Sequence, residues 1–193
     1  MLRLFAKMAV SFFVVALFGG CTSFDLNWLQ SREDGMAARA EKVRTDAEFL
    51  LSREEPLAAL DLIIEQEAGP GLFARTYVTA YNLLLDQAQA YYMEGDLVAA
   101  GEFWRQALNR YPTDVNLQDA IIMNEIDLGQ RLDRCAARLL EAGLAAYRNG
   151  QLQEAIDVWS QIRNFHPDYK ASQQAIQTTR KQLKSLELLH NPG

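Results

Sequence analysis

The sequence repeats itself once, and this internal repeat restricts the fold more than any other feature. Residues 84–112 and 139–167 align at a shift of 55 positions, with 11 identities in 29 aligned positions. The identical pairs include Gly95 and Gly150, and both copies end on a proline. Each copy has apolar residues at helical spacing, a glycine turn, a second amphipathic stretch and the closing proline. The sequence therefore predicts an all-α fold built from repeated helix pairs.

A weaker copy precedes the two strong ones. Ala47 and Ala59 occupy its small-residue positions, but it lacks the central glycine and the closing proline. We expect its first helix to begin at Ser31, and a helix inserted between the strong copies to end at Gly129. The three predicted helix pairs span about 36–70, 72–112 and 131–167. The inserted helix spans about 114–128, and a solvated capping helix spans about 168–190. Together these elements form a repeat domain over residues 31–190, a short α-solenoid.

The first 20 residues are typical of an export signal. Arg3 and Lys7 form a basic start, and Met8 to Phe18 form an apolar run. That run is shorter than the roughly 20 apolar residues of a membrane-spanning helix, and it has the length of a signal-peptide core. We therefore predict a removable segment over residues 1–20, followed by a tether over residues 21–30.

The end of this segment resembles the lipobox of bacterial lipoproteins. The residues are Leu17-Phe18-Gly19-Gly20-Cys21, where Phe18 departs from the usual aliphatic residue. The resemblance implies cleavage before Cys21 and a lipid on its thiol. Thr22 follows where Asp marks retention in the inner membrane of enteric-type bacteria, so we expect an outer-membrane protein that faces the periplasm. The alternative is an ordinary export signal followed by an unrelated cysteine.

Charge argues against a nucleic-acid partner. Removing Arg3 and Lys7 from the 19 basic residues leaves 17 against 25 acidic ones, a formal net charge of −8. An acidic protein without a basic stripe is poorly suited to nucleic acid. Arg131, Arg134 and Arg138 recur at helical spacing and are expected to form a solvated helix edge. Cys135 lies among them and is expected to be a small buried apolar residue.

The packing positions of the strong copies resemble the tetratricopeptide repeat. Small residues stand where the two helices of that repeat cross, at Ala88 and Ala100 and at the matching Gly143 and Ala155. Trp104 and Trp159 fill the aromatic position of the family, and Pro112 and Pro167 fill the closing position. Tyr91 fills the large position on the first helix, where the second copy departs with Ala146. The resemblance implies a scaffold that binds a protein segment along the first helix of each pair.

The resemblance also implies which side chains line that groove. By position they are Asn82, Leu85, Gln89, Tyr92 and Met93 from one unit, and Leu140, Leu144, Tyr147 and Arg148 from the next. The Lys and Asn residues with which chaperone-tail receptors of this family hold a peptide carboxylate are absent. What remains is apolar and aromatic with a polar edge, suited to an amphipathic or extended apolar segment. The alternative is that the inserted residues 113–130 fill the groove.

No motif argues for an enzyme. The two histidines, His166 and His190, lie in a turn and at the C-terminus, and no spacing matches a metal site, a phosphate loop or a nucleophile elbow. The sequence therefore predicts no cofactor, no metal and no small-molecule substrate. We expect a lipid-anchored adaptor that holds a protein partner of the cell envelope, as in outer-membrane, pilus or secretin assembly. The alternative is a permanent accessory subunit of an envelope complex, with its groove filled.

Overall fold

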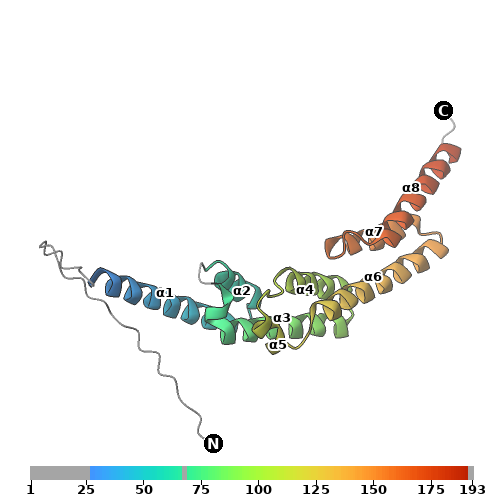
Figure 1. Ribbon diagram of the computed structural model, residues 1–193. Coiled ribbons are helices and arrows are strands. Elements are labelled where there is room, and N and C mark those ends of the chain that lie inside the picture. The colour runs from blue at the N-terminus through green and yellow to red at the C-terminus, as the bar shows by residue number, and fades with distance from the viewer. Residues whose placement is uncertain (1–26, 67–68, 191–193) are drawn as a thin grey trace, which may run out of the picture. The chain divides into compact units, whose positions relative to one another are not determined.

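The computed structural model describes residues 27–66 and 69–190, which are helical apart from short connections (Figure 1). It divides into two units, Met1–Ala37 and Ala38–Gly193, each considered by itself. In the first unit only residues 27–37 are described, and they form the start of a helix. The predicted signal segment, Cys21, Thr22 and most of the tether lie outside the described residues.

The described residues form eight α-helices and two 3-10 turns, and they contain no strand. The elements are α1 (Asn27–Ser52), α2 (Pro56–Ile64), η1 (Pro70–Phe73), α3 (Ala74–Glu94), α4 (Leu97–Asn109), α5 (Val115–Ala120), α6 (Glu125–Arg148), α7 (Leu152–Gln161), η2 (Ile162–Asn164) and α8 (Lys170–His190). The predicted all-α repeat fold is confirmed. No helix within residues 27–66 and 69–190 has both the length and the hydrophobicity needed to cross a membrane.

The two strong copies fold as helix pairs that pack through their small residues. α3 packs on α4, and α6 packs on α7 (Figure 1). In the α6–α7 pair, a Cβ on Gly143 would lie 2.2 Å from Nε1 of Trp159, so only glycine allows the indole to sit against the backbone of α6. There Trp159 Nε1 donates to the carbonyl oxygen of Leu140 at 3.0 Å. The α3–α4 pair has Ala88 at the glycine position, and the buried Nε1 of Trp104 has no hydrogen-bond partner.

One turn geometry recurs in all three helix pairs. Gly95 and Gly150 have φ of 88° and 77°, and Glu54 holds the same position in the first pair with φ of 60°. At each turn the amide of this residue donates to the carbonyl three residues earlier, and the next amide donates to the carbonyl five residues before it. These bonds satisfy carbonyls that the helix end leaves free. The first pair therefore keeps the turn of the strong copies without their glycine.

Glu54→Gly is expected to raise the free energy of unfolding by about 1 kcal/mol, because a left-handed conformation is unfavourable for every residue with a Cβ. The Glu54 side chain is exposed, so its loss removes little packing. Urea denaturation measures the change. The matched control is Glu48→Gly in the interior of α1, which should lower the free energy of unfolding by about 1 kcal/mol. Destabilisation by both substitutions would contradict the shared turn.

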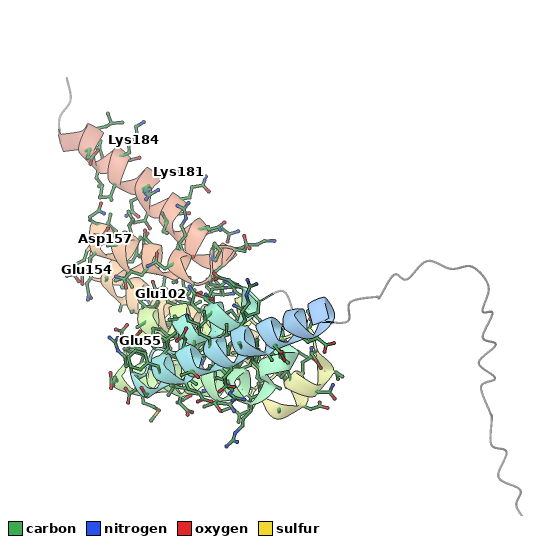
Figure 2. The ribbon with its side chains drawn as sticks, turned by 90° about the vertical axis from the view of Figure 1, so that its left-hand side faces the viewer. Glu55, Glu102, Glu154, Asp157, Lys181 and Lys184 are labelled. Atoms are coloured by element: carbon green, nitrogen blue, oxygen red, sulfur yellow. The ribbon has the colours of Figure 1, made fainter. Side chains whose placement is uncertain are left out.

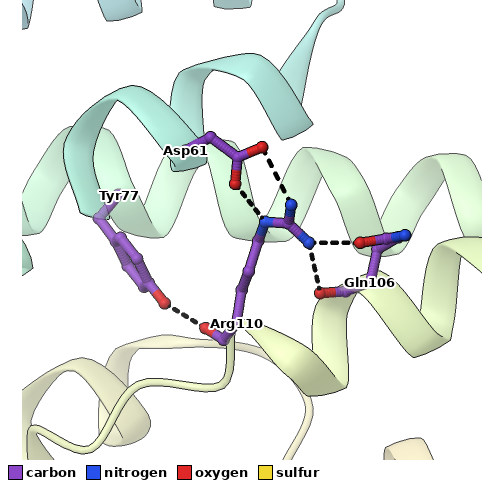
Figure 3. A network of polar contacts seen from close by, with 4 residues as sticks. All are labelled: Asp61, Tyr77, Gln106 and Arg110. Carbon is purple, nitrogen blue, oxygen red and sulfur yellow. Dashed lines mark hydrogen bonds and ion pairs between the residues drawn. The ribbon is translucent and has the colours of Figure 1, made fainter. Parts of the chain in front are cut away.

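A polar network joins the first helix pair to the second (Figure 3). Arg110, just after α4, binds Asp61 of α2 through two bonds, Nε–Oδ1 at 2.7 Å and Nη2–Oδ2 at 3.0 Å. The same guanidinium donates to Gln106, while the hydroxyl of Tyr77 donates to the Arg110 carbonyl oxygen. Burial raises the pKa of Tyr77 to about 12, so its hydroxyl remains a donor at neutral pH. The network therefore fixes α2 against the α3–α4 pair.

The helix predicted over 114–128 is wrong in its extent. α5 ends at Ala120, Ile121 is extended, and α6 begins at Glu125 and runs through Gly129. The start of α6 is set by Asn124, whose side chain accepts the amide of Asp127 at 2.9 Å. Gly129 has an ordinary helical backbone and does not end a helix. The first helix of the third pair therefore extends by about a turn and a half beyond its predicted start.

Two further boundaries differ from the prediction. α1 begins at Asn27, so Ser31 lies inside the helix and does not cap it. The predicted capping helix is present as α8, which packs against α7, but its last leucines, Leu186, Leu188 and Leu189, are exposed. The solvated character expected of this helix therefore holds for its C-terminal end.

Candidate functional site

The α3 half of the predicted groove is bridged by the segment that leads into α6. The Asn82 side chain accepts the amide of Ile122 at 3.2 Å. The Gln89 side chain accepts from Arg131 at 2.7 Å. Leu85 is only 2% exposed and belongs to the hydrophobic core. These contacts leave little of this half of the groove available to a partner.

Two arginines of α6 complete this closure. The guanidinium of Arg138 lies 5.2 Å from the ring centre of Tyr92, and that of Arg131 lies 5.5 Å from the Trp104 ring. Cations over aromatic faces at such distances are attracted by the ring quadrupole. Arg134 and Arg138 are exposed, as expected of a solvated helix edge, whereas Arg131 is half-buried, so the expectation is wrong for Arg131.

The α3 half of the groove is therefore filled, as the alternative interpretation predicted. The alternative expected the inserted helix to fill it. The covering residues lie in the connection after α5 and in the first half of α6. Two predicted lining residues fall outside the closed region, because Met93 and Arg148 lie at the exposed C-terminal ends of α3 and α6. Met93 is 76% exposed.

The α6 half of the predicted groove is lined by half-buried side chains. Leu140, Leu144 and Tyr147 of α6 are half-buried and pack around Trp159, next to Ala175 and Ile176 of α8. The Tyr147 hydroxyl bonds the Gln182 side chain of α8 at 2.7 Å. α8 therefore lies along this part of the groove instead of leaving it fully open.

A cavity of about 330 Å³ remains between α6 and α8. Leu144, Tyr147 and Trp159 form its apolar side. The α8 residues around it are small or polar: Ala171, Gln174, Ala175, Thr178 and Thr179. The sequence prediction missed these residues, although the recurrence of Ala171, Ala175 and Thr178 on one helix face signals a site of close approach. This α6–α8 cavity is an accessible part of the predicted groove in the second repeat.

The two side chains that could be chemically reactive, Cys135 and His166, have structural roles instead. Cys135 is fully buried, and burial raises the pKa of its thiol to about 11 against the opposing effect of the neighbouring arginines, so the thiol is protonated at neutral pH. This confirms the prediction of a small buried apolar residue. His166 Nε2 lies 2.9 Å from Asp133 Oδ1 and connects the turn after η2 to α6. No group of metal-ligating side chains occurs within residues 27–66 and 69–190.

Comparison with known proteins identifies the repeat. Residues 83–114 and 139–169 each match the family model of the tetratricopeptide repeat. No curated protein and no solved structure matches the chain. The two strong copies are therefore similar to the tetratricopeptide repeat, a repeat family of protein–protein interaction. The α1–α2 pair lies outside the matched residues, so its relation to the repeat remains a prediction.

Proposed function

We propose that this tetratricopeptide-repeat chain is a lipid-anchored adaptor that faces the periplasm and holds a protein partner of the cell envelope near a membrane. The observation that carries the proposal is the α6–α8 cavity, because Leu144 and Tyr147 on its wall are two of the residues that the resemblance to this repeat assigns to the binding groove. Its apolar wall and small polar rim suit one or two apolar side chains of a protein segment. A membrane tether raises the local concentration of such a partner.

The outer helices favour an adaptor over a permanent accessory subunit. A subunit packed into a larger complex through α4 and α7 would present large apolar side chains there. None of the exposed large hydrophobic residues in residues 33–66 and 69–189 lies on either helix, and α2, the second helix of the weaker pair, has one such residue, Ile64 at its end. The accessory subunit nevertheless has one supporting observation, the closure of the α3 half of the groove by α6. It is therefore the second candidate.

The anchor is tested with the full chain and its Cys21→Ser variant in a Gram-negative bacterium. The wild type should fractionate with membranes and carry a mass increase from its lipid, because the sequence before Cys21 resembles a lipobox. The variant should leave the membrane fraction, while Cys135→Ser serves as the matched control and should stay there. Equal partition of all three proteins would contradict the proposed anchor.

The partner site is tested by co-purification from crosslinked envelopes with two matched variants. Leu144→Glu places a charge in the α6–α8 cavity and should abolish recovery of the partner, since an uncompensated carboxylate disfavours an apolar ligand. Met93→Glu makes a comparable change at an exposed site away from that cavity and should leave recovery intact. Melting curves confirm that both variants are folded. Loss of the partner with Met93→Glu alone would place binding at the end of α3.

A further inference from the structure

A second and larger cavity lies between α7 and α8. Its volume is about 670 Å³, roughly twice that of the α6–α8 cavity. Trp159 and Ile176 contribute the apolar part, and Ser160, Gln173 and Gln177 supply polar groups. Apart from Trp159, none of its lining residues borders the α6–α8 cavity. The two cavities therefore lie on different sides of the contact between α7 and α8.

Four cations surround this α7–α8 groove. They are Arg163 from η2 and Arg180, Lys181 and Lys184 from α8, and no aspartate or glutamate contributes to the lining. All four are exposed, and none forms an ion pair with another residue of the described ranges 27–66 and 69–190. Figure 2 shows Lys181 and Lys184 along α8 and the acidic Glu154 and Asp157 on α7. In a chain of formal net charge −6, this concentration of positive charge is local.

We infer that the α7–α8 groove binds an acidic segment of a protein, with carboxylates facing the four cations and an apolar side chain on the floor. Complementary charge accelerates and orients such an encounter, and the apolar contact supplies affinity that salt does not screen. This inference adds a second surface to the proposed function. It does not depend on the α6–α8 cavity.

The shape of the groove favours a protein segment over an anionic membrane surface. A bilayer contacts side chains that project from a protein, as in amphipathic helices that lie in the interface. Here the aromatic residue is recessed, because Trp159 is only 1% exposed. The projecting Leu188 and Leu189 of α8 are not among the lining residues of the groove. A flexible segment can place an apolar side chain on the floor while its carboxylates face the cations, whereas a flat surface cannot reach the floor.

Binding is measured by fluorescence anisotropy with the full chain and a short labelled peptide of alternating Glu and Leu residues. The control peptide has Gln in place of each Glu. The double variant R180E/K184E changes the groove, and R134E/K170E makes the same charge change at exposed positions outside it. We expect the acidic peptide to bind the wild type and R134E/K170E alike. Its affinity for R180E/K184E should fall by about tenfold or more, since attraction is replaced by repulsion.

Added salt should weaken binding of the acidic peptide to the wild type, and the Gln peptide should bind weakly throughout. Melting curves establish that the variants are folded. If R180E/K184E is not folded, R180Q/K184Q takes its place. Equal affinity for the two peptides, equal loss in both double variants, absence of peptide binding, or binding to phosphatidylglycerol vesicles alone would overturn the inference. Leu144→Glu should retain peptide binding, so failure of the adaptor site and failure of this groove are distinguishable.

Discussion

Trp159→Ala is expected to lower the free energy of unfolding by about 3–5 kcal/mol, the range for truncating a buried aromatic side chain. The indole lies against Gly143, donates to the Leu140 carbonyl oxygen and packs at 6.2 Å from the Tyr147 ring. It also borders both cavities of the second repeat. Removing it therefore leaves a void where α6, α7 and α8 meet. Trp104→Ala should have an effect of similar size, because Trp104 is fully buried in the first repeat.

Urea denaturation followed by circular dichroism measures these changes. Phe49→Ala serves as the control, because Phe49 is 60% exposed and its truncation should change stability by less than about 0.5 kcal/mol. Conservative variants sharpen the test. Trp159→Phe should cost about 1 kcal/mol more than Trp104→Phe, because only Trp159 loses an indole hydrogen bond. Wild-type denaturation curves for both alanine variants would contradict the repeat packing.

Phe165→Ala is expected to lower the free energy of unfolding by about 3–5 kcal/mol, because this ring is fully buried where the second repeat meets α4 of the first. Phe165 follows η2 and is fully buried against α4 of the preceding repeat. A Cβ on Gly101 would lie 2.5 Å from Cγ of its ring, and Arg105 Nε donates to its carbonyl oxygen at 2.6 Å. Truncation opens a cavity at the junction of the repeats and weakens their coupling.

A double-mutant cycle with Gly101→Ala tests this contact. In the wild type the added methyl collides with the ring and should cost about 1–3 kcal/mol. In the Phe165→Ala protein the space is free, and the methyl should be neutral or stabilising. The two substitutions are therefore expected to be non-additive, as residues in direct contact are. Strict additivity would show that the ring does not occupy the space beside Gly101.

The repeated positions allowed most of the fold to be predicted from the sequence. Gly95 and Gly150 were recognised as helix ends because a positive φ favours glycine, and Asp96 was recognised as a cap, which its bond to the Ala99 amide confirms. The same reasoning failed at Gly129, since glycine is tolerated within a helix at about 1 kcal/mol. It also overlooked Glu54, because only the structure shows a glutamate holding a left-handed turn.

The candidate binding surface was harder to predict, because tertiary contacts decide which parts of the same chain cover a helix face. Leu144 and Tyr147, which were predicted to line the groove, line the α6–α8 cavity, and their role in binding stays a prediction. Asn82 and Gln89 were also predicted to line the groove, but the sequence does not show that Ile122 and Arg131 form hydrogen bonds with them. The extension of α6 back to Glu125 produces this closure. It depends on the cap at Asn124.

In-cell photo-crosslinking tests most directly whether the chain is an adaptor that binds through the α6–α8 cavity. A photoreactive residue would replace Gln174, which is exposed and lines that cavity. In two control strains it would replace Gln89, in the closed α3 half of the groove, or Gln161, which lines neither cavity. The adaptor account predicts one discrete protein adduct from position 174 and none from positions 89 and 161. An adduct from position 161 alone, or from none of the three, would contradict it and favour the accessory subunit.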